Sequence, residues 1–224
     1  MVLLAADTSG NDGSLALARV ENRNPAIELL EIVPLAGGTF SAQLVPQIAA
    51  LLEKFGYGKA DLAGFAVAAG PGSFTGLRVG LAAIKALGET LAKPIAAVSR
   101  LEALARSSGS HPAVLAAIDA GRSQVYVGDY RLNPKLQMLS EQLLSREEFL
   151  KAARDRVVVT ADPNWAEAAR GAGAVVMQIS IPRADVIARI CWEKILRGET
   201  VSPEHLEANY IRRSDAEIFS RTNP

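Results

Sequence analysis

The sequence is poor in the residues that build metal centres, disulfide frameworks and hydrolytic sites. It contains one cysteine, Cys191, and two histidines, His111 and His205, which have no histidine or cysteine partner at metal-ligand spacing. A disulfide within the chain is therefore impossible, which fits a reducing cytosol. The residue types and their spacing predict no metal site and no Ser-His-Asp set, so we expect no catalytic residues.

Net charge and long apolar runs are also missing. Lys plus Arg and Asp plus Glu both number 24, whereas a protein that holds nucleic acid by itself usually has a basic surface. We therefore expect any nucleic acid to be held mainly through a partner. No apolar stretch approaches the roughly 20 residues that span a bilayer, and the N-terminal "MVLLAADTSG" has no basic signal-peptide start. These absences predict a soluble, cytoplasmic protein with no membrane partner.

The sequence does contain a repeated α/β pattern. The segment "VLLAADTSGNDGSLALARV" at residues 2–20 is echoed by "VLAAIDAGRSQVYVGDYRL" at 114–132, and each has a strand ending in aspartate, a turn and a second strand. Helices and strands alternate after each copy, which predicts a duplicated α/β fold with two small subdomains. A chance likeness of two apolar strands is the alternative. The break "GSHP" divides the chain into subdomains 1–108 and 109–224. Packing of the C-terminal tail on the first subdomain is the alternative for the end of the chain.

A glycine-rich stretch, "GPGSFTGLRVG" (70–80), follows an apolar strand. It matches neither the P-loop nor the dinucleotide-binding template, because the glycine spacing differs and Leu77 stands where a P-loop has lysine. Gly76 and Gly80 lie within a helix predicted over about 74–92, where each costs roughly 1 kcal/mol relative to alanine. Such glycines usually permit another backbone to approach closely. From the pattern alone, that approach lies either within the protein or across an interface.

Two aspartates, Asp7 and Asp119, end the first strand of each repeat. Carboxylates at strand ends can face a crevice and bind a metal–phosphate group, and Thr8 and Ser9 would then belong to the same phosphate loop. Capping of the following turn is the alternative for both aspartates.

Several motifs together resemble one known family. They are "GPGSFTGLRVG", "DTS" (7–9), "LVP" (44–46), "AIDA" with Gln124, Val125 and Tyr126, and "YIR" (210–212). On these motifs the sequence resembles the TsaB (YeaZ) family. The resemblance implies the fold of actin, Hsp70 chaperones and sugar kinases, an RNase H-like fold with two similar α/β units.

The resemblance also implies a function. TsaB-like chains are partner subunits of the bacterial machinery that forms threonylcarbamoyladenosine in tRNA, next to the anticodon. A longer subunit, TsaD, carries the metal and the chemistry, and an ATPase, TsaE, joins the assembly. By resemblance this chain is a non-catalytic scaffold that meets tRNA only through the complex and forms a homodimer when alone. It has no cofactor of its own, and whether ATP or ADP binds at an interface of the complex stays open.

Family members pair through two helices of the first unit. The residues implied in this contact are Leu44, Ile48, Leu51, Leu52, Phe74, Thr75, Gly76, Val79, Gly80 and Ala83. On this basis Gly80→Leu is expected to weaken pairing more than it weakens the fold.

The sequence departs from the family at two positions. Phe40 stands where many members have a histidine, and Arg122 lies one place later than the usual arginine. An alternative function is that of a small ATP-dependent kinase or ATPase of the same fold, with Asp7 and Asp119 around magnesium. A metalloprotease is a third reading, which the lack of clustered metal ligands disfavours.

Overall fold

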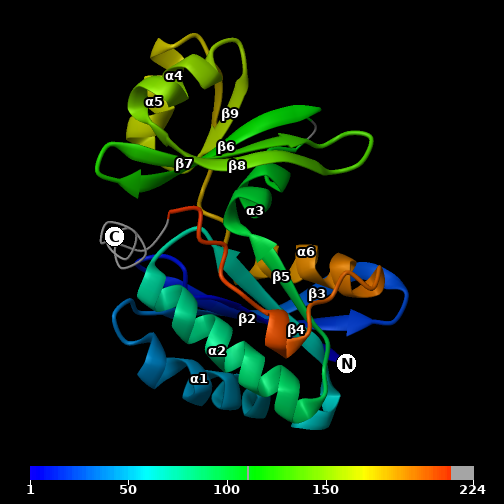
Figure 1. Ribbon diagram of the computed structural model, residues 1–224. Helices are drawn as coiled ribbons and strands as arrows, with labels where there is room; N and C mark the ends of the chain where they lie inside the picture. The colour runs from blue at the N-terminus through cyan, green and yellow to red at the C-terminus, as the bar shows by residue number, and fades with distance from the viewer. Residues whose placement is uncertain (110, 213–224) are drawn as a thin grey trace, which may run out of the picture. The chain divides into compact units, whose positions relative to one another are not determined.

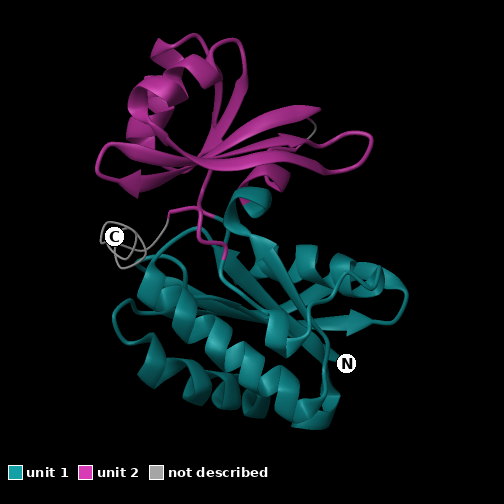
Figure 2. Ribbon diagram, in the orientation of Figure 1, with its two compact units in different colours: residues 1–103, 182–208 teal, residues 104–181, 209–224 magenta. Residues whose placement is uncertain are grey.

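A computed structural model describes residues 1–109 and 111–212 of the chain (Figure 1). The described residues form two compact units: unit 1 consists of residues 1–103 and 182–208, and unit 2 of residues 104–181 and 209–212 (Figure 2). The sequence-based division into 1–108 and 109–224 differs from this one mainly because residues 182–208 pack with unit 1. Within the described ranges, no helix is long and apolar enough to cross a membrane.

Unit 1 is built on a mixed sheet in the order β3-β2-β1-β4-β5. The strand β1 pairs antiparallel with β2 and parallel with β4, and β4 pairs parallel with β5. The antiparallel pair forms because "TSGNDG" supplies turn residues between two apolar runs. The strands are β1 (Val2–Asp7), β2 (Gly13–Glu21), β3 (Asn24–Leu35), β4 (Leu62–Gly70) and β5 (Ile95–Ser99).

Helices cover both faces of this sheet. The helices α1 (Phe40–Lys54) and α2 (Phe74–Leu91) lie side by side on one face, and α6 (Ala184–Leu196) covers the other (Figure 1). Alternate residues of β1 accordingly face opposite sides: Leu4 packs in the α1–α2 core and Leu3 in the α6 core, both fully buried. This explains why β1 is a continuous apolar run rather than an alternating one. The short elements of this region are η1 (Lys59–Asp61), η2 (Pro203–His205) and α3 (Arg100–Arg106).

Unit 2 repeats the arrangement. Its sheet has the order β10-β9-β6-β7-β8, so each strand takes the place of the strand five earlier in unit 1. The pairing of β6 is antiparallel with β7 and parallel with β9, as for β1 with its neighbours. This common topology confirms the duplicated α/β fold. The strands are β6 (Ala113–Gly121), β7 (Gln124–Arg131), β8 (Gln137–Ser145), β9 (Val157–Thr160) and β10 (Val175–Gln178).

Two helices, α4 (Arg146–Ala153) and α5 (Pro163–Gly171), pack on one face of the second sheet. Their contact centres on Phe149 and Trp165, whose rings meet edge to face with centroids 5.3 Å apart, a favoured aromatic geometry. Ser145 caps α4 in a reciprocal box with Glu148, and its hydrogen bonds lower the pKa of that carboxyl below the ordinary value. The local sequence therefore specifies where α4 begins.

Candidate functional site at the strand ends and outer helices of unit 1

The carboxyl ends of β1, β4 and β5 meet at one edge of the sheet of unit 1, because these strands are parallel. Open α/β sheets bind ligands at this edge. Asp7 ends β1, Pro71 follows β4, and Arg100 follows β5. We name Asp7, Thr8, Ser9, Pro71 and Arg100 the edge cluster. The sequence predicted the first three of these residues and missed Arg100, whose only local signal is its place after the apolar strand "PIAAVS".

The polar side chains of the edge cluster are buried and contact one another or the neighbouring backbone. Asp7 is 5% exposed, Ser9 1% and Arg100 9%. One oxygen of Asp7, Oδ1, accepts hydrogen bonds from the Ser9 amide, at 2.9 Å, and from the Ser9 hydroxyl. The other oxygen, Oδ2, lies 3.9 Å from Nε of Arg100, and Nη1 of Arg100 donates to the carbonyl of Pro71 at 3.2 Å.

The end of β1 contacts the start of α2 directly. The Ser73 amide donates to the Ser9 carbonyl at 2.7 Å, and the Thr8 hydroxyl donates to the Gly76 carbonyl at 2.7 Å. A Cβ added to Gly76 would lie only 2.0 Å from the Thr8 carbonyl oxygen, and one added to Gly80 2.3 Å from Thr8 Oγ1. These glycines therefore allow close packing inside unit 1.

This packing corrects the expected role of the glycine side of α2. Gly76 and Gly80 are buried against Thr8, so little of either residue is left for a partner to contact. Of the two readings that the pattern left open, the internal one is right. Gly80→Leu was expected to weaken pairing more than the fold. Because a leucine at this position would collide with Thr8, the substitution should instead destabilise the free chain.

A magnesium–phosphate group, which the fold implies at such an edge, does not fit the residues present. The carboxylate of Asp7 is already bonded to Ser9 and faces the guanidinium of Arg100. A Cβ on Gly72 would lie 2.2 Å from the Ser9 carbonyl oxygen. Since the Ser9 loop and the glycine loop touch, the gap that a phosphate would need between them is filled by the chain itself.

In unit 2, Asp119 has the position of Asp7 in the repeat but a different set of partners. Its Oδ1 accepts from the indole Nε1 of Trp165 at 2.8 Å, and its Oδ2 accepts from the Gly121 amide at 3.1 Å. The aspartate thus caps its own turn and anchors α5. Arg122, the residue displaced by one place, lies in this turn with a positive φ of 55°. Turn capping, the alternative considered for Asp119, is what the structure places there.

Replacing Asp119 by alanine is expected to destabilise unit 2. The substitution leaves the indole N–H of Trp165, whose residue is 5% exposed, without its acceptor, which costs about 1–3 kcal/mol. Urea unfolding of the free chain measures the loss. Asp119→Asn should lose less stability than Asp119→Ala, because its amide oxygen still accepts from the indole although its amide nitrogen cannot accept from the Gly121 amide. Equal stability of the alanine variant and the wild type would contradict this role.

The large apolar residues of α1 face the core and not a partner. Leu44, Ile48, Leu51 and Leu52 are 1%, 5%, 3% and 8% exposed and belong to the hydrophobic core of unit 1. Their expected contribution to a partner contact is therefore corrected. The hydrophobic stripe of α1 is the stripe that covers the sheet.

The outward sides of α1 and α2 carry exposed charged residues such as Arg78 of α2, together with many small, uncharged residues. Val45 is the largest of these that is strongly exposed, at 55%. Of the predicted contact residues, Thr75 is exposed, Val79 and Ala83 are half-buried, and Phe74 is half-buried beneath the guanidinium of Arg78, 3.8 Å from the ring centroid. We name this surface the outer helix face; its members are Ala42, Val45, Pro46, Ala49, Thr75, Val79, Ala82, Ala83 and Ala86.

A hollow of about 440 Å³ adjoins the outer helix face. The turn 10–12, the loop at Gly37 and Gly38, and the starts of α1 and α2 line it. Phe40 forms part of its wall and is 6% exposed, because its ring packs in the core beneath Gly13. The residue that replaces the usual histidine is thus a core aromatic.

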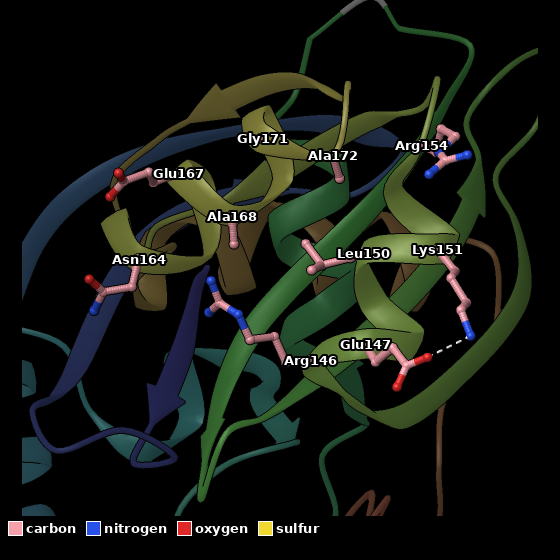
Figure 3. A pocket seen from close by; sticks show the side chains of 10 residues that line it. All are labelled: Arg146, Glu147, Leu150, Lys151, Arg154, Asn164, Glu167, Ala168, Gly171 and Ala172. Carbon is pink, nitrogen blue, oxygen red and sulfur yellow. Dashed lines mark hydrogen bonds and ion pairs between the residues drawn. The ribbon is translucent and has the colours of Figure 1, made fainter.

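A second hollow, of about 820 Å³, lies between α4 and α5 in unit 2 (Figure 3). Leu150 and Ala168 face each other across it, and charged side chains of both signs surround it. Lys151 pairs with Glu147 at 2.8 Å. In the parts of the chain that the structure describes, no group of three or more His, Cys, Asp or Glu side chains could hold a metal ion, here or elsewhere.

Comparisons with known proteins agree with this architecture. A family model described as "TsaD: tRNA N6-adenosine threonylcarbamoyltransferase" matches residues 32–188. The "tRNA threonylcarbamoyladenosine biosynthesis protein TsaB" of Bacillus subtilis is 32% identical over 159 residues, which cover 70% of this chain and 67% of the relative. The chain belongs to the TsaB family. The match to the TsaD model means that this TsaB-family chain also shares sequence with the transferase.

Solved structures support the same conclusion. YeaZ from Pseudomonas aeruginosa superposes with a TM-score of 0.73 at 26% identity, and the match covers 93% of this chain and 99% of that one. A ROK family protein from Streptococcus pneumoniae gives a TM-score of 0.51 at 10% identity, over 89% of this chain and 99% of that one. The second likeness concerns the fold alone and confirms the actin-like, sugar-kinase-like architecture.

Proposed function

We propose that this TsaB-family chain is a non-catalytic pairing subunit in the formation of threonylcarbamoyladenosine in tRNA. It binds the TsaD-type transferase through the outer helix face and supports that subunit's activity. The observation that carries the proposal is the combination of a helix pair that exposes a stripe of small residues with an edge cluster in which Asp7 is bonded to Ser9 and paired with Arg100. The pathway is inferred from the name of the Bacillus subtilis relative.

The composition of the outer helix face supports pairing. Contiguous exposed apolar surface marks interaction sites, and small residues such as Ala49 and Ala82 let another helix approach closely. The TsaD model matches residues 32–188 of this chain, a range that includes α1 and α2. A TsaD-type subunit therefore has a corresponding helix pair, and two similar helix layers can pack against each other. The same face would pair two copies when the chain is alone.

The edge cluster supports the absence of catalysis. Asp7 is bonded through Oδ1 to Ser9 and faces Arg100 through Oδ2, and Asp119 holds Trp165 and its own turn. We propose that the chain holds no nucleotide of its own and that ATP or ADP used by the machinery binds elsewhere in the complex. A TsaE-type ATPase and tRNA then meet the assembly in the cytoplasm, and tRNA makes few contacts with this charge-balanced chain.

Reconstitution with purified components tests the proposal. The chain, the TsaD-type subunit and the other components are taken from the same cell, and tRNA modification is measured with and without the chain. We expect a stable complex of the two subunits, a large loss of modification when the chain is omitted, and no turnover by the chain alone. Full modification without the chain would overturn the scaffold role. ATP turnover by the pure chain that Asp7→Asn abolishes would do the same.

A further inference from the structure

We propose that Arg100 is a positioning residue: from inside unit 1 it fixes the start of α2, and so sets the shape of the outer helix face that the partner contacts. This inference rests on the proposed function, because it concerns the same pairing surface. Arg100 lies at the carboxyl edge of the sheet, where open α/β sheets bind ligands. At this edge its guanidinium contacts Asp7 and the Pro71 carbonyl instead of a ligand.

The charges of unit 1 assign Arg100 to Asp7. Among the described residues of unit 1, the buried charged ones are Asp7, Arg100 and Glu102. Glu102 is paired with Lys194 of α6 at 2.9 Å. Arg100 and Asp7 therefore neutralise each other, with side chains 10% and 7% exposed. A buried charge that loses its partner is strongly destabilising, so this pair constrains where the loops that carry it lie.

The contacts of Arg100 connect three loops at the edge of the sheet. The residue starts α3 after β5, its Nε faces Asp7 at the end of β1, and its Nη1 bonds to the carbonyl of Pro71 after β4. Its Nη2 also lies 3.7 Å from the position that a Cβ on Gly10 would take. One guanidinium thus holds the β1–β2 turn and the β4–α2 loop in a fixed relation.

The second of these loops leads directly into the pairing surface. Pro71 lies two residues before Ser73, the N-cap of α2, and the Ser73 amide is bonded to Ser9. Thr75 of the outer helix face follows within the first turn of the helix. A shift of the Pro71 loop would therefore move the first turn of α2 relative to α1.

The chemistry of the contact requires a guanidinium. A planar guanidinium presents several donors in fixed directions, whereas the lysine ammonium is a single point charge on a flexible stem. Arg100→Lys keeps the charge near Asp7 but cannot also hold the Pro71 carbonyl in the same geometry. Arg100→Lys therefore separates the effect of the positive charge next to Asp7 from the effect of the bond that positions the Pro71 loop.

The test compares two variants that each break one buried ion pair of unit 1. Arg100→Met removes the edge connection, and Lys194→Met removes the pair between α6 and Glu102, on the sheet face away from α1 and α2. Pairing with the TsaD-type subunit is measured by titration, and melting is measured on the free chain. Both variants should melt at lower temperature. Only Arg100→Met should weaken pairing, by about tenfold or more, a step of about 1.4 kcal/mol.

Arg100→Lys covers the case in which Arg100→Met does not fold. This variant should melt close to the wild type and still pair several-fold more weakly. Wild-type pairing by Arg100→Lys, or equal weakening by Arg100→Met and Lys194→Met, would overturn the inference. If the wild-type chain itself fails to bind the TsaD-type subunit, the proposed function fails instead, so the two failures are distinguishable.

Discussion

Val45→Arg is expected to reduce pairing with the TsaD-type subunit at least about a hundredfold while the free chain keeps its melting temperature. Val45 is 55% exposed on α1 and lies within the outer helix face. In the free chain an arginine there remains in water. In the paired state it would be buried among small apolar residues without a counter-charge, which costs several kcal/mol. Titration of the two purified subunits and thermal melting of the free chain measure the two effects.

A matched substitution in unit 2 controls for nonspecific effects of the added charge. Val175 on β10 is 63% exposed, so Val175→Arg changes a similarly exposed valine outside the outer helix face. We expect this variant to pair like the wild type. If both arginine variants pair as tightly as the wild type, α1 does not form the contact. If both lose the same amount of affinity, the added positive charge has a general effect.

Gly76→Ala is expected to destabilise the free chain by about 3 kcal/mol, at the upper end of typical overpacking costs. Alanine would normally stabilise a helix by up to about 1 kcal/mol relative to glycine. Here the added Cβ would stand 2.0 Å from the backbone carbonyl oxygen of Thr8, which has no rotamer through which to move away. The end of β1 and the start of α2 must therefore separate. Urea unfolding of the dilute chain measures the loss.

Gly171→Ala is the matched control for this experiment. Gly171 is also a helical glycine, at the end of α5, but a Cβ added there would meet nothing within 4 Å. Its stability should stay the same or rise slightly. If Gly76→Ala unfolds at the wild-type urea concentration, the contact between Thr8 and α2 is looser than the structure indicates.

The contrast between these two glycines shows what the sequence could and could not predict. Glycines at four-residue spacing indicate that something approaches the helix closely, and Gly76 and Gly80 do meet such a neighbour. The pattern does not identify the neighbour, because Thr8 is far away in sequence. The family resemblance favoured a partner chain, and the long-range contact with β1 decides otherwise.

The orientation of α1 has a related explanation. The periodicity of Leu44, Ile48 and Leu52 correctly predicted one apolar side of a helix. In a helix on a covered sheet, the side with the largest apolar residues faces the sheet, and a pairing surface is left with the smaller residues next to it. The fold itself was accessible from sequence because the strand–aspartate–turn–strand repeat is local. The role of Arg100 could not be predicted from the sequence, because its partners Asp7 and Pro71 lie at the ends of other strands.

The placement of α6 has a consequence for synthesis of the protein on the ribosome. One face of the first sheet, which includes Leu3, Ala5 and Ala66, is covered by Ile187 and other residues of α6. Those strands leave the ribosome long before α6 does, and the whole of residues 104–181 is made in between. Unit 1 therefore cannot complete its core during translation until residues 104–181 have been made and α6 has emerged. During that interval the nascent chain presents an uncovered apolar sheet, a state that invites chaperone binding or aggregation.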